Sequence, residues 1–191
     1  MVVVSLIVTL LMQGLSQALN IRARLLRHQQ LAIVASLQER WFRDTVSSAL
    51  ADLPDAFGIM NGTSNSMAFA TAGPLVGPGP QRVTWSLQRV PGGWSLNYSD
   101  PAIGDIVVIP GPLSNASFAY LGADSAQWSD RWDPDFDEKP GADNDVVQVV
   151  PRMVRLQAQG ASGTLYWLVP IHVEATMPRF LRLEDALDGL L

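Results

Sequence analysis

An acidic stretch between positions 130 and 145 is the part of the sequence best suited to binding a metal ion. Its acids, in chain order, are Asp130, Asp133, Asp135, Asp137, Glu138, Asp143 and Asp145. Asp133, Asp135 and Asp137 have the alternating spacing of a calcium loop, because hard cations take several carboxylate oxygens. Glu138 stands where such a loop has glycine, and two prolines restrict the backbone. We expect a solvated acidic loop, with a calcium site and a partner-docking loop as the alternatives.

Two tryptophans, Trp128 and Trp132, flank the start of this stretch. A large aromatic side chain beside a charged loop can pack into the core below it or can contact a partner protein. We expect both indoles to anchor the loop to the core.

Other residues that could do chemistry are scarce. The chain has no cysteine, which excludes disulfides, thiolate metal sites and a cysteine nucleophile. Its two histidines are His28, among arginines, and His172, two residues before Glu174, and we expect surface positions for both. The sequence contains no phosphate-binding loop, nucleophile elbow or HExxH motif. A net charge of −5 argues against nucleic-acid binding. We therefore expect neither an enzyme nor a resident cofactor.

The first 21 residues are uncharged and mainly apolar, and a bilayer-spanning helix needs about 20 such residues. We predict that they form a membrane-anchoring helix, with a secretory signal peptide or a buried core helix as the alternatives. The predicted anchor residues are Val2, Val3, Val4, Leu6, Ile7, Val8, Leu10 and Leu11. Polar residues such as Gln13 and Gln17 weaken this prediction, because polar side chains are costly in lipid.

Residues 22–53 contain neither proline nor glycine and continue the helical pattern. Val34, Leu37 and Trp41 recur at helical spacing, which predicts an amphipathic helix that packs through these residues. Pro54 marks the end, because the residue before proline avoids helical geometry. The two segments together predict one helix of about fifty residues.

Residues 54–191 read as a β-rich domain of short apolar runs separated by turns. The predicted strands cover 66–71, 81–90, 94–98, 106–109, 117–121, 146–157 and 164–171. Segments 81–90 and 94–98 form one predicted hairpin, and the last two segments form another. The predicted fold class is α+β, with a long N-terminal helix packed on an antiparallel sheet. Its parts are 1–21, 22–53 and 54–191.

Several segments resemble the type IV pilin-like family, and among its members the J-type minor pseudopilins of type II secretion systems. They are MVVVSLIVTLLMQGL at 1–15, the helix end around Trp41, SFAYLG at 117–122, WSDRW at 128–132 and VVPRMVRLQ at 149–157. Family members carry a basic leader and a Gly-Phe-Thr-Leu-(Leu/Ile)-Glu run before the apolar helix. The resemblance implies that this run precedes Met1.

The resemblance also implies a function and a location. Proteins of this kind insert in the inner membrane by a single helix, with the C-terminal domain in the periplasm. A prepilin peptidase cuts and methylates them, and their helices then pack into a pseudopilus, whose tip holds the J-type subunit with other minor pseudopilins. The alternatives are a minor type IV pilin used in adhesion, and a signal-anchored periplasmic binding protein.

Overall fold

The computed structural model of the chain describes residues 2–51, 58–123, 125–134, 146–161, 163–172 and 176–178. Within them the elements are α1 (Val2–Ser47), β1 (Asn61–Gly62), β2 (Ser66–Thr71), β3 (Gln81–Val90), β4 (Gly93–Asp100), β5 (Gly104–Leu121), β6 (Trp128–Ser129), β7 (Val146–Gln148), β8 (Met153–Gly160), β9 (Gly163–Pro170) and β10 (Thr176–Pro178). The chain forms two compact units, Met1–Arg40 and Trp41–Leu191. The first unit is helical, and the second contains the end of α1 and all the strands.

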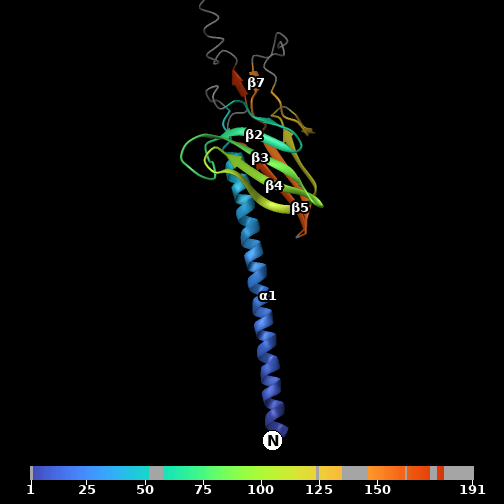
Figure 1. The fold of residues 1–191 in the computed structure, drawn as a ribbon. Helices are drawn as coiled ribbons and strands as arrows, with labels where there is room; N and C mark the ends of the chain where they lie inside the picture. Colours follow the sequence, from blue (N-terminus) through green and yellow to red (C-terminus); the bar gives the residue numbers. More distant parts are fainter. Residues whose placement is uncertain are drawn as a thin grey trace, which may run out of the picture. The chain divides into compact units, whose positions relative to one another are not determined.

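The strands of the second unit form a curled antiparallel sheet in the order β1-β2-β3-β4-β5-β8-β9 (Figure 1). Neighbours in the sheet follow one another along the chain, apart from the segment between β5 and β8. Strand β6 pairs with the end of β5, and β7 and β10 form a separate two-stranded sheet. Alternation of buried and exposed residues in β3 and β8 places one face of the sheet on the core.

Strand β5 is long enough to belong to both halves of the sheet. Its first part pairs with β4 and its second part with β8. The register shifts between Ser114 and Ser117, and Asn115 has a φ of 51° there. Asparagine tolerates this left-handed conformation, and the extra residue of a bulge bends the strand and increases its twist. The two runs predicted at 106–109 and 117–121 are therefore one bent strand.

The last two turns of α1 lie within the second unit and fill the inside of its sheet. The Phe42 ring lies 5.2 Å from the Trp85 ring and 5.3 Å from the Trp167 ring, measured between centroids. The Phe118 ring stacks nearly parallel to the Phe42 ring, with 6.3 Å between the centroids. All four side chains are buried. Because these residues come from α1, β3, β5 and β9, one aromatic cluster joins the helix end to both halves of the sheet.

The chain after α1 continues into the sheet. Ala49 forms a β-bridge with Thr71, the Leu50 amide donates to the Ala70 carbonyl, and the Ala72 amide donates to the Ser48 carbonyl. These bonds explain why the helix ends at Ser47 instead of continuing to Pro54, as the sequence had predicted. Backbone groups that pair with β2 cannot also bond within a helix.

The predicted fold class, a long helix packed on the sheet, is wrong. Strands hold more of the described residues than the helix does, and only the helix residues from Trp41 onward belong to the unit that contains the sheet. The spacing of the apolar residues correctly predicted a helix. The prediction that these residues pack against the sheet was wrong, because Val34 is 50% exposed and Leu37 is 41% exposed.

The predicted membrane anchor is also wrong. Within the part of the chain that the structure describes, no helix is both long enough and apolar enough to span a bilayer. Gln13 and Gln17 interrupt the apolar run of α1, and arginines follow from Arg22; polar and basic side chains are costly in lipid. The inner-membrane location and the single-pass topology were predicted from this segment, so both predictions are wrong as well.

Candidate assembly surface

The acids considered as candidate metal ligands lie only partly within the described residues. Asp133 pairs with Arg131, whose Nη2 lies 2.5 Å from the Asp133 Oδ2, and both side chains are largely exposed. Asp135 and Asp137 lie outside the described residues. Among the residues that are described, no three acids or histidines come together as a metal site would require. The solvated acidic loop stays a prediction, with a calcium site at 133–137 as one alternative.

The two flanking tryptophans are held by the strands beneath the loop. Trp132 pairs through its backbone with Gly62, and its Nε1 donates to the Val149 carbonyl at 3.4 Å. Trp128 is half-buried, and the Arg155 guanidinium carbon lies 4.7 Å from its ring centroid. A cation placed over an indole ring is stabilised by the ring's quadrupole. Both side chains therefore attach the start of the loop to the sheet.

An open cleft of about 450 Å³ lies beside Trp132. Its lining includes Tyr120, Gln127, Arg131, Trp132 and Gln148. The Tyr120 hydroxyl donates to the Thr63 carbonyl at 2.9 Å, and burial raises the pKa of this tyrosine well above its usual value. A phenol held neutral in this way cannot serve as a base near neutral pH.

The predicted surface histidines can be placed in part. His172 is exposed, and its backbone amide donates to the Ser47 carbonyl at 3.4 Å. Glu174, its predicted neighbour, lies outside the described residues. The side chain of His28 is likewise not described, although its backbone lies within α1.

The residues predicted to pack α1 differ in their surroundings. Trp41 is partly buried and packs against the core of the second unit. Val34 and Leu37 belong to the helical unit and are exposed. The predicted anchor residues from Val2 to Leu11 lie in α1, but their side chains are outside the described set.

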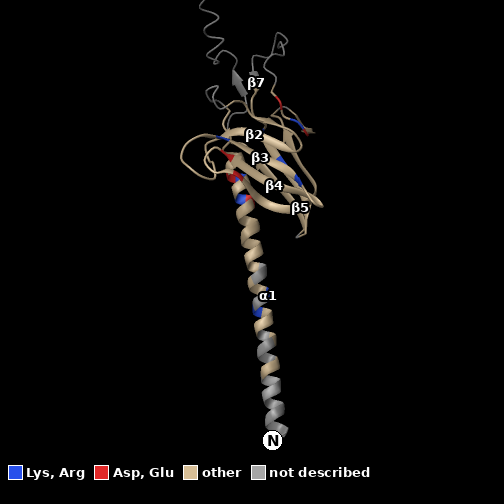
Figure 2. Ribbon diagram, in the orientation of Figure 1, with Lys and Arg blue, Asp and Glu red and all other residues tan. Residues whose placement is uncertain are grey.

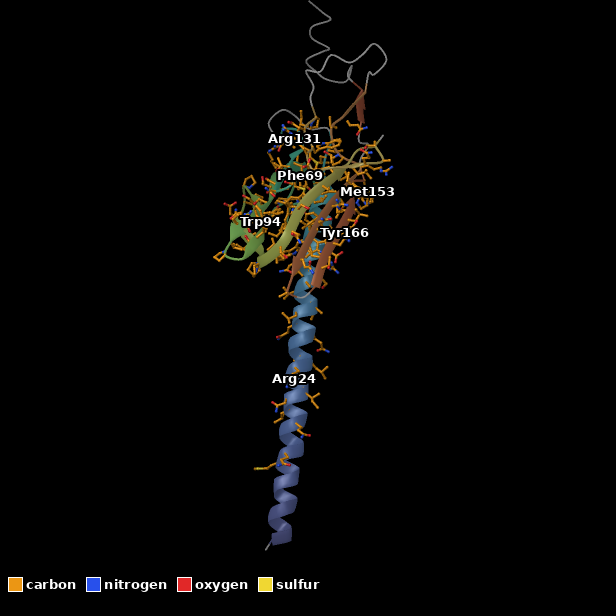
Figure 3. The ribbon with its side chains drawn as sticks, turned by 90° about the vertical axis from the view of Figure 1, so that its right-hand side faces the viewer. Arg24, Phe69, Trp94, Arg131, Met153 and Tyr166 are labelled. Atoms are coloured by element: carbon orange, nitrogen blue, oxygen red, sulfur yellow. The ribbon has the colours of Figure 1, made fainter. Side chains whose placement is uncertain are left out.

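The most unusual surface of the described chain is the exposed apolar part of α1. Four of its side chains recur every seven residues, and we name them the helix row: Met12, Leu19, Leu26 and Ile33. They are 68%, 56%, 50% and 65% exposed, respectively. A seven-residue apolar repeat is typical of a helix that pairs with another helix, because it keeps one seam facing the partner. Figure 3 shows side chains standing out from helix α1 near Arg24.

Further exposed apolar side chains lie on other sides of α1. Ile21 and Leu31 are both 59% exposed, and each lies about 140° around the helix from Leu26. The charged side chains described before Gln38 are Arg22 and Arg24, both basic, and Figure 2 shows few charges along the coloured part of α1. Exposed apolar surface is a feature that interaction sites share.

Comparison with protein-family models finds no match for this chain, and comparison with curated proteins finds none either. The surface must therefore be interpreted from its own residues. The sequence analysis missed the helix row, although its signal, an apolar residue at every seventh position from Met12 to Ile33, is visible in the sequence.

Proposed function

We propose that this protein is a structural subunit that joins a larger assembly through helix α1. The observation that carries the proposal is the helix row, whose four side chains are each at least half exposed. Large apolar side chains exposed at a coiled-coil repeat are stabilised when a partner helix removes them from water. The proposal assigns no reaction to the protein.

The partners that we propose are other subunits with comparable helices. Arginines stand at positions 22, 24 and 27, so a second copy in parallel register would bring like charges together. A different subunit, or a staggered copy, avoids this repulsion. The resemblance to J-type minor pseudopilins supports other minor pseudopilins of a type II secretion system as the partners. The minor pilins of a type IV pilus remain the alternative.

Sedimentation velocity of the full chain over a wide concentration range tests the proposal. The test variant is Leu19→Gln with Leu26→Gln, which makes the two central residues of the helix row polar. The matched control is Ile21→Gln with Leu31→Gln, which removes equally exposed apolar side chains from other sides of the helix. Glutamine has good helix propensity, and circular dichroism checks that the helix remains.

We expect the wild type and the control to self-associate weakly as concentration rises, and the helix-row variant to need at least about tenfold more protein, a change of about 1.4 kcal/mol. In this experiment a second copy of the chain takes the place of the natural partner, so self-association measures the contact between helices. The proposal fails if the wild type stays monomeric throughout, or if the helix-row variant associates as the control does.

A further inference from the structure

Strand β9 forms one edge of the large sheet, with β8 as its neighbour on one side. The opposite edge is protected in two ways. Strand β1 has only two residues, and the end of β2 is covered by the bridge between Ala49 and Thr71. Short strands and covered edges prevent pairing with other chains. Strand β9 therefore differs from the opposite edge, because it has eight residues and ends the sheet.

The hydrogen bonds around β9 show which of its backbone groups face outward. The Ile171 amide donates to the Arg152 carbonyl at 3.0 Å, on the side of β8. The Leu168 carbonyl lies three residues before Ile171. It accepts a hydrogen bond from the Arg43 Nη1 at 2.9 Å, on the side of the strand that faces away from β8. Backbone groups alternate along an antiparallel strand, so Thr164, Tyr166 and Leu168 present theirs outward.

Part of this outward edge is already covered. Arg43 occupies the Leu168 carbonyl, Pro170 has no amide hydrogen, and the His172 amide donates to the Ser47 carbonyl. The helix end thus covers the second half of β9. In the first half, the described residues supply no acceptor or donor for the backbone groups of Thr164 and Tyr166. Four outward backbone groups are therefore left for an added strand.

The open half of β9 lacks the features that usually keep sheet edges apart. The strand reads GTLYWLVP, with no charged residue and no bulge, and its only proline is in the covered half. Natural edges are commonly protected by lysine, by proline or by a bulge. The Tyr166 side chain is 56% exposed and stands on the outer face of the strand (Figure 3). Exposed tyrosine beside open backbone groups is a common anchor for a partner.

We propose that β9 pairs with β9 of a second copy of this chain. The pairing is antiparallel, with Thr164 of each copy opposite Tyr166 of the other. This register uses all four open backbone groups reciprocally and leaves Leu168, which Arg43 covers, beyond the paired segment. Each threonine then faces a tyrosine, and the two Leu165 side chains face each other, both favourable cross-strand pairs. The strand itself is neutral and places no like charges opposite each other in this register, and its four open backbone groups are complementary to those of an identical strand.

Amide hydrogen exchange measured by NMR on the full chain tests this pairing. The chain carries the Leu19→Gln and Leu26→Gln changes, so association through the helix row does not contribute. On dilution we expect the amides of Thr164 and Tyr166 to exchange at the rate of unprotected amides. At high concentration we expect both to slow by about tenfold or more. The amides of Leu165 and Trp167, which face β8, stay protected throughout.

Thr164→Pro removes one outward donor without removing a bond to β8, and proline is tolerated at such an edge position. Thr164→Ser keeps the donor and is the matched control. We expect the concentration-dependent slowing at Tyr166 to disappear in the proline variant and to persist in the serine variant. Exchange that is equally fast at every concentration overturns the proposal. So does protection that persists on dilution, because a segment of the same chain would then cover the edge. Because this chain already carries the Leu19→Gln and Leu26→Gln changes, failure of the proposed helix association would not alter the exchange expected at β9.

Discussion

At the scale of single residues, one hydroxyl joins the helix end to the sheet. Thr45 is fully buried, and its Oγ1 accepts a hydrogen bond from the Trp85 Nε1 at 3.1 Å while donating to the Trp41 carbonyl at 2.8 Å. Thr71 donates its hydroxyl to the Thr45 carbonyl at 2.7 Å. Buried polar groups that are all paired fix one arrangement of the elements that carry them.

Thr45→Val should test this role of the hydroxyl. Valine has nearly the same shape, but it leaves the buried indole N–H of Trp85 without an acceptor, so we expect a loss of about 1–3 kcal/mol in the free energy of unfolding. Chemical denaturation at low protein concentration measures it. Thr45→Ser keeps the oxygen and should be less destabilising than valine. If valine is the milder change, the bond to Trp85 contributes little.

At the scale of elements, the short segment Trp41–Ala49 acts as part of the core of the sheet unit. Phe42 and Val46, one helical turn apart, and Ala49, just after the helix, are fully buried, and Arg43 covers the edge of β9. The same helix has exposed apolar residues before position 38. One continuous helix therefore has two functions along its length, core packing at its end and a free surface before it.

Phe42→Ala should show where the helix contributes to folding. Removing this ring leaves a cavity among Trp85, Phe118 and Trp167, and we expect a loss of about 3–5 kcal/mol in the free energy of unfolding. Leu31→Ala removes an exposed side chain from the same helix and should change it by less than about 0.5 kcal/mol. Equal effects of the two changes in thermal or chemical unfolding would contradict this division of the helix.

The elements also show what the sequence could and could not predict. Strands 66–71 and 81–90 were predicted with their observed bounds, because alternation and flanking turn residues act locally. The sequence did not predict that β5 is one continuous strand, because a bulge at Asn115 interrupts the alternation of apolar and polar residues. The early end of α1 was missed because the sheet competes for its backbone. The membrane anchor was predicted from the apolar residues of 1–21, whereas no helix among the described residues has the length and apolarity of a span.

The candidate surface was predictable only in part. Apolar residues of the helix were recognised, but Val34 and Leu37 were assigned to packing against the sheet, where the structure has them exposed. Burial is set by which elements meet, and a helical pattern alone does not say what covers it. The open edge of β9 was not foreseen, since edge position follows from strand order and from Arg43, 125 residues away in the chain.

At the scale of the whole molecule, charge is divided between the two units. Residues 1–40 hold four arginines and one glutamate, a net charge of +3, so the total of −5 leaves −8 for the residues from 41 onward. The helical unit is thus basic and apolar, whereas the remainder of the chain is acidic. Two modes of association follow from this division: helix against helix, opposed by like charge, or helix against acidic residues, favoured by opposite charge.

The salt dependence of self-association distinguishes these modes. If helices meet through the helix row, added salt screens the repulsion among Arg22, Arg24 and Arg27, and sedimentation should show stronger association as salt rises. Replacing Arg22 and Arg24 with glutamine should strengthen association at low salt and flatten its salt dependence. Association that weakens with salt would instead mean that the basic helix binds acidic residues of another copy, and the helix row would not be the contact. The proposed subunit function depends on the first outcome, because only contact between helices extends to other subunits that carry the same kind of helix.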